Sequence, residues 1–157
     1  MIKKITAALM AIALLISSGG FAAGKQRMTV TVSAVLESNH SVGNEWTVAC
    51  TMNGTPISED LDPQNEKLKY IKKPEKEKTI GEGTVQLTAG DELEIYTLVT
   101  EYDKDYPDDG TDTTTRTVSS ADLRNGFTVE ISVTVIENAG RYEGNAAVWR
   151  ITYQFAP

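Results

Sequence analysis

The chain has little of the chemistry on which many enzymes and metalloproteins depend. Its 157 residues include one cysteine and one histidine. A disulfide framework needs paired cysteines, a structural zinc site needs several Cys or His ligands, and a Ser-His-Asp triad needs a suitably placed histidine base. The composition therefore argues against all three. Cys50 falls in an alternating run, where we expect a small buried side chain instead of a reactive thiol.

Positive charge is also scarce. The chain has 15 Lys and Arg against 22 Asp and Glu, which gives a formal net charge of −7. Recognition of phosphate groups needs a basic face, so we expect no nucleic-acid partner. Hydrophobic residues make up 40% of the chain, enough for one packed domain at this length.

The chain has no hydrophobic run long enough to favour a membrane-spanning helix. The longest apolar run, Ile5–Ile16, is uncharged and has 12 residues, whereas a spanning helix needs about 20. Lys3 and Lys4 precede this run and small residues follow it near Ala22 and Gly24, in the order of a secretory signal peptide. The start of the chain therefore predicts export, with cleavage close to Gly24.

We accordingly predict a signal peptide over residues 1–23 and a β-sandwich domain over residues 24–157, with no transmembrane segment in the mature form. The short start with two lysines is typical of bacterial proteins. No cysteine follows the uncharged run directly, so the cleaved end offers no thiol for lipid attachment. We expect a secreted, extracellular bacterial protein.

After Gly24 the sequence has no helical period of useful length, and alternation with a period of two recurs instead. The expected strands cover 28–36, 45–52, 83–89, 91–102, 113–119, 127–137 and 146–155. A short edge strand is also expected near 68–71, within a solvated stretch rich in lysine and glutamate. That stretch has a second interpretation, a basic docking surface for an acidic partner. Seven to eight strands predict an all-β fold, a single antiparallel β-sandwich with Trp46 and Trp149 in its core.

One loop has an unusual concentration of acid. Its carboxylates are Glu101, Asp103, Asp105, Asp108, Asp109 and Asp112. Like charges this close cost free energy unless a cation neutralises them. Calcium is the natural candidate because it takes six to eight oxygen ligands in flexible geometry. The spacing is not that of an EF-hand, and an acidic loop that is simply solvated remains the alternative.

The pattern of Glu101-x-Asp103 followed by Asp108-Asp109-Gly110 resembles the third top loop of a C2 domain. The resemblance implies a C2-like sandwich, with an Ig-like one as the alternative, and a calcium site. The implied metal ligands are Glu101, Asp103, Asp105, Asp108 and Asp109 from this loop, with Asn44 and Glu45 from the first loop.

Three functions follow from these features. The first is a secreted, non-catalytic binding module for a protein, glycan or cell-surface component, with calcium in the acidic loop. The second is a structural or accessory β-sandwich without a ligand. The third is a small hydrolase that uses paired carboxylates, which an exposed acidic loop disfavours because a catalytic acid needs its pKa raised in a cleft. We expect no catalytic residues, and we expect a monomer.

Overall fold

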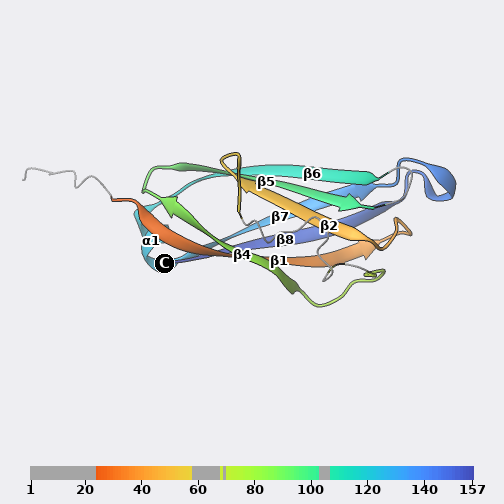
Figure 1. Ribbon diagram of the computed structural model, residues 1–157, viewed down its shortest axis with the longest axis horizontal. Coiled ribbons are helices and arrows are strands. Elements are labelled where there is room, and N and C mark those ends of the chain that lie inside the picture. Colours follow the sequence, from red (N-terminus) through yellow and green to blue (C-terminus); the bar gives the residue numbers. More distant parts are fainter. Residues whose placement is uncertain (1–23, 58–67, 69, 103–106) are drawn as a thin grey trace, which may run out of the picture.

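A computed structural model describes residues 24–57, 68, 70–102 and 107–157. Two antiparallel four-stranded sheets pack face to face (Figure 1). This confirms the predicted all-β sandwich. The predicted signal peptide lies outside the described residues. No helix of the described residues is long and apolar enough to cross a membrane.

The first sheet has the strand order β4-β1-β8-β7. Its strands are β1 (Gln26–Asn39), β4 (Lys78–Leu87), β7 (Phe127–Ile136) and β8 (Ala146–Ala156). The second sheet has the order β3-β2-β5-β6. Its strands are β2 (Trp46–Met52), β3 (Thr55–Pro56), β5 (Glu92–Glu101) and β6 (Asp108–Thr117).

The core lies between the sheets and follows from the alternation in sequence, because successive side chains of a strand point to opposite faces. In β1 every second residue from Met28 to Leu36 is buried, and in β8 the same holds from Ala147 to Phe155. Trp46 and Trp149 meet edge to face with ring centroids 5.4 Å apart. Both tryptophans are core residues, as predicted.

The prediction of an edge strand near 68–71 was wrong. Leu68, Tyr70 and Ile71 form no strand. Tyr70 has a φ of 66°, which is incompatible with an extended strand. Leu68 and Ile71 are instead buried, and the Trp46 Nε1–H donates a hydrogen bond of 3.0 Å to the Ile71 carbonyl. The segment is therefore anchored to the core by two side chains and one hydrogen bond.

Other features also differ from prediction, among them the start of β4 at Lys78 instead of 83. β6 begins at Asp108, well before the expected start at 113, because it pairs with β5 along its whole length and this pairing overrides the poor β-propensity of aspartate and glycine. A short helix, α1 (Ser120–Asn125), lies between the strands expected at 113–119 and 127–137, where the sequence showed no helical period of useful length. Ser119 caps this helix in a capping box with Asp122, which satisfies free N–H groups of the first turn.

Both edges of the sandwich are closed by a glycine that allows two backbones to meet. A Cβ atom at Gly110 of β6 would overlap the carbonyl oxygen of Thr134 in β7. A Cβ atom at Gly83 of β4 would overlap the carbonyl oxygen of Ile57, directly after β3. The two sheets therefore touch at each side.

The sandwich has two different ends. We use "loop end" for the β1–β2 turn, residues 70–73, the adjoining ends of β5 and β6, and the β7–β8 connection with its short 3-10 helix η2 (Gly140–Tyr142). We use "turn end" for the β2–β3 and β4–β5 turns, α1 and the last residues of β8. In Figure 1 the loop end is on the right and the turn end, with α1 and the C-terminus, is on the left.

Candidate functional site

Two buried carboxylates lie side by side at the loop end. Glu101 is the last residue of β5, and Asp108 is the first residue of β6 and its cross-strand partner. Directly opposed residues of an antiparallel pair project to the same face, which here is the inner one. Glu101 is 3% exposed and Asp108 is 1% exposed. The acidic stretch is thus partly inside the sandwich, and not wholly solvated as one interpretation of the sequence held.

Glu101 organises the β1–β2 turn. Its Oε1 atom accepts hydrogen bonds from the backbone N–H groups of Asn44, at 3.0 Å, and Glu45, at 3.3 Å. Gly43 lies against the same carboxylate with a φ of 105°, and a Cβ atom there would overlap Oε1. The turn therefore closes over the carboxylate only because residue 43 is glycine.

Asp108 binds the opposite loop. Its Oδ1 atom accepts a hydrogen bond of 2.8 Å from the backbone N–H of Asn138, which follows β7. Its Oδ2 atom is buried and has no hydrogen-bond partner among the described residues. A buried carboxylate oxygen without a partner costs free energy, and a cation or a water molecule would remove that cost.

The other predicted metal ligands do not join Glu101 and Asp108 in one cluster of side chains among the described residues. Asp109 follows Asp108 on β6, so its side chain lies on the outer face, where it is exposed and accepts a 2.6 Å hydrogen bond from the Thr100 hydroxyl. Asn44 and Glu45 lie beside Glu101 and donate hydrogen bonds to its carboxylate through their backbone N–H groups. Asp103 and Asp105 lie outside the described residues. Within the described part of the chain, no group of three or more His, Cys, Asp or Glu side chains could hold a metal ion.

A groove that sequence reasoning missed adjoins Glu101. It has a volume of about 400 Å³ and is open to solvent. Its lining residues are Asn39, Ser41, Gly43, Asn44, Lys72 and Lys73. The first four residues lie between the strands expected at 28–36 and 45–52, and the two lysines belong to the solvated stretch around 68–71. Nothing local in the sequence indicated that these segments meet.

The wall of the groove formed by the β1–β2 turn is held by its own side chains as well as by Glu101. Asn39 accepts a 2.9 Å hydrogen bond from the Val42 N–H and donates a 3.0 Å hydrogen bond to the Gly43 carbonyl. Ser41 has a φ of 67°, a left-handed conformation that serine seldom adopts. These contacts fix the shape of the turn.

The lone cysteine belongs to a buried polar cluster in the core. The Tyr153 hydroxyl lies 2.9 Å from Cys50 Sγ and 2.6 Å from the Thr97 hydroxyl. Burial raises the pKa of the Cys50 thiol to about 11 and moves the pKa of Tyr153 upward as well. The thiol is therefore neutral and enclosed, which confirms the prediction of a small buried side chain.

Comparison with known proteins does not assign a family or a function to the chain. No family model matches the chain, and no curated protein matches it. A function is therefore argued from the loop end itself.

Proposed function

We propose that this chain is a secreted, non-catalytic binding module that attaches to a protein, glycan or cell-surface component through its loop end. Calcium bound to the acidic β5–β6 hairpin stabilises that end. The observation that carries the proposal is Asp108, a buried carboxylate whose Oδ2 atom has no hydrogen-bond partner among the described residues and which lies opposite a second buried carboxylate, Glu101.

The relation between the first loop and the acidic hairpin supports a C2-like calcium site. The resemblance to C2 domains implies that both segments contribute ligands. Glu101 accepts backbone hydrogen bonds from Asn44 and Glu45, so the two segments are in direct contact. Calcium prefers carboxylate and carbonyl oxygens, which such an arrangement can provide together with Asp103 and Asp105. In this proposal calcium has a structural role, because a secreted protein meets it continuously and gains stability from ligation.

The burial of the paired carboxylates supports a binding role over hydrolysis. A catalytic acid and base must touch the substrate, and Glu101 and Asp108 are almost completely enclosed. The described residues that line the groove include no carboxylate. An accessory domain without a ligand is the second candidate, favoured by the fact that each buried carboxylate already binds the backbone of a loop.

Thermal unfolding in calcium and in chelator tests the proposal. With calcium at 100 times its dissociation constant, we expect the native state to gain about 2.7 kcal/mol, which is a shift of several degrees in Tm. Magnesium should do less, because it requires a small octahedral shell. The double substitution Asp103→Asn and Asp108→Asn should abolish the calcium response.

Asp122→Asn is the matched control, since it removes a carboxylate at the turn end and should leave the calcium shift intact. Equal Tm values for the wild type in millimolar calcium and in chelator would contradict the calcium site and leave the accessory domain as the better description.

A further inference from the structure

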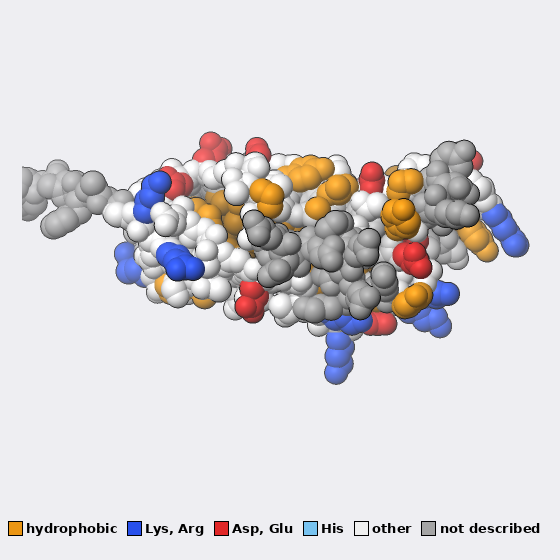
Figure 2. All heavy atoms as spheres, viewed as in Figure 1, with side chains coloured by type: hydrophobic (Ala, Val, Ile, Leu, Met, Phe, Trp, Pro, Cys, Tyr) orange, Lys and Arg blue, Asp and Glu red, His pale blue; other side chains and the backbone are white. Residues whose placement is uncertain are grey.

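The large hydrophobic side chains that are exposed gather at one end of the molecule. Among the described residues these are Tyr70, 72% exposed, Tyr102, 63%, Ile136, 50%, and Tyr142, 45%. All four belong to the loop end. Figure 2 shows hydrophobic side chains among charged ones at this end, on the right. Clustered exposed aromatic residues are a common sign of a binding surface.

Backbone contacts place three of these residues around the β1–β2 turn. The Tyr70 N–H donates to the Asn44 carbonyl at 2.7 Å, and the Tyr102 N–H donates to the Glu45 carbonyl at 2.8 Å. On the other side of the turn, Ile136 pairs with Ala146, whose carbonyl accepts the His40 N–H at 3.0 Å.

The described side chains that line the groove in this turn carry positive charge, unlike the protein as a whole, while the Glu101 carboxylate lies beside the groove. The charged side chains among its described lining residues are Lys72 and Lys73, although the chain carries a net charge of −7. The remaining lining groups include the Asn44 amide and the Ser41 hydroxyl, whereas the Asn39 amide is already bonded within the turn. Such groups are suited to a ligand that combines negative charge with many hydroxyls.

We infer that the loop end binds an acidic saccharide, with a uronate carboxylate at Lys72 and Lys73 and sugar rings against the exposed tyrosines. This inference rests on the proposed binding function and names its ligand class. Asparagine and serine side chains can exchange hydrogen bonds with ring hydroxyls, and tyrosine offers a flat apolar face with a polar tip. An acidic polypeptide is the competing ligand, and poly-glutamate is included in the test below to distinguish the two.

The binding surface is held in place before any ligand arrives. Glu101 and Asn39 fix the β1–β2 turn through hydrogen bonds to its backbone. The bond from Trp46 Nε1 to the Ile71 carbonyl holds the segment that carries the lysines. A surface ordered in advance loses less conformational entropy on binding.

Calorimetric titration with short oligomers of galacturonate, mannuronate and hyaluronan tests the inference. We expect at least one of them to bind in chelator at low salt, and to bind more weakly as salt is added. The double variant Lys72→Gln and Lys73→Gln should raise Kd about tenfold or more, and Tyr102→Ala should raise it several-fold. Lys25→Gln with Arg27→Gln removes the same charge at the turn end and should change Kd by less than about twofold.

Any of four results would overturn the inference. One is no binding of any uronate oligomer at millimolar concentration. Another is equal binding of the methyl-esterified galacturonate oligomer or tighter binding of poly-glutamate. The last is an equal effect of the two double variants. Because the titration is done in chelator, a missing calcium shift does not affect it, and a failed titration leaves the calcium result standing.

Discussion

The two ends of the sandwich are closed by the same kinds of contact in different surroundings. At the loop end, Trp46 and Trp149 pack edge to face and both are buried. At the turn end, Phe127 and Phe155 stack with centroids 4.2 Å apart, and Phe127 is only partly buried.

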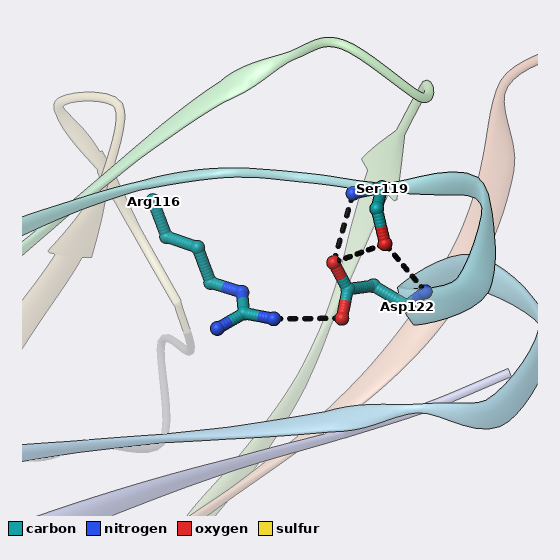
Figure 3. Close-up of polar contacts among 3 residues, drawn as sticks. All are labelled: Arg116, Ser119 and Asp122. Carbon is teal, nitrogen blue, oxygen red and sulfur yellow. Dashed lines mark hydrogen bonds and ion pairs between the residues drawn. The ribbon is translucent and has the colours of Figure 1, made fainter.

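Each end also uses a carboxylate to bind backbone N–H groups. At the turn end this is Asp122, which accepts hydrogen bonds from the Ser119 N–H at 2.8 Å and the Ser119 hydroxyl at 2.7 Å (Figure 3). Arg116 donates to its other oxygen at 2.7 Å and lies over the Phe127 ring. All of these carboxylate partners are close in sequence and partly exposed to water.

At the loop end the corresponding bonds join segments that are distant in sequence. Glu101 binds a turn 57 residues earlier, and Asp108 binds a loop 30 residues later. Both carboxylates are buried, so a lost bond cannot be replaced easily by water. The comparison shows that the carboxylate hydrogen bonds of the turn end are local in sequence and partly solvated. Those of the loop end are buried and join segments that are distant in sequence.

The largest effect is expected from the aromatic pairs. Trp149→Ala should cost about 3–5 kcal/mol of unfolding free energy, because it removes a fully buried ring. Phe127→Ala should cost clearly less, about 1–2 kcal/mol, because its ring is already partly solvated. Urea denaturation measures both. A cost under about 1 kcal/mol for Trp149→Ala would mean that the last strand presents its other face to the core.

The buried carboxylate should come next. Glu101→Ala leaves the Asn44 and Glu45 N–H groups without their acceptor and should cost about 2–3 kcal/mol. Amide exchange at these two positions should speed up, since the turn loses its contact with β5. Asp109→Ala is the control, because this neighbouring carboxylate is exposed and its loss should cost about 0.5 kcal/mol or less. Equal costs for the two variants would remove the distinction between buried and solvated carboxylates.

The cap of α1 should have a smaller effect. Ser119→Ala removes the side chain that accepts the Asp122 N–H and should cost about 1 kcal/mol. Chemical denaturation at neutral pH measures it. A cost comparable to that of Glu101→Ala would show that the turn end is as tightly constrained as the loop end.

The smallest effect concerns pH. The hydrogen bonds from Ser119, with the Arg116 guanidinium, hold the pKa of Asp122 below its ordinary value of 3.8. A lowered carboxyl pKa in the folded state stabilises the protein above the unfolded pKa, and this stability is lost as pH falls through the folded pKa. The stability difference between wild type and Asp122→Asn should therefore be present at pH 7 and shrink below about pH 4. A constant difference across this range would contradict the ionic role of Asp122.

The strands and the core could be predicted from sequence because alternation directly reports which face is buried. The same alternation indicates one feature of the site. Leu93, Ile95 and Val99 face inward on β5, so Glu101 at the same parity must face inward too. The inward position of Glu101 was not predicted, because the hairpin is rich in acidic residues and charged side chains are usually expected on the surface.

Other features could not be predicted because they depend on contacts distant in sequence. The early start of β6 requires its pairing with β5, and the burial of Leu68 and Ile71 requires a core formed by other strands. The groove arises where residues 39–44 meet Lys72 and Lys73. No local pattern specifies that meeting.

The glycines at the two sides of the sandwich have a consequence for how copies of the protein behave in concentrated solution. An open sheet edge is a template on which another molecule can add a strand, and this is a common start of aggregation. At Gly110 and Gly83 a backbone carbonyl of the opposite sheet lies where a Cβ atom would be, so each edge strand packs directly against the other sheet. A larger side chain at either position would push the sheets apart and uncover hydrogen-bonding groups for neighbours. We therefore expect a substitution at either glycine to favour self-association as well as unfolding.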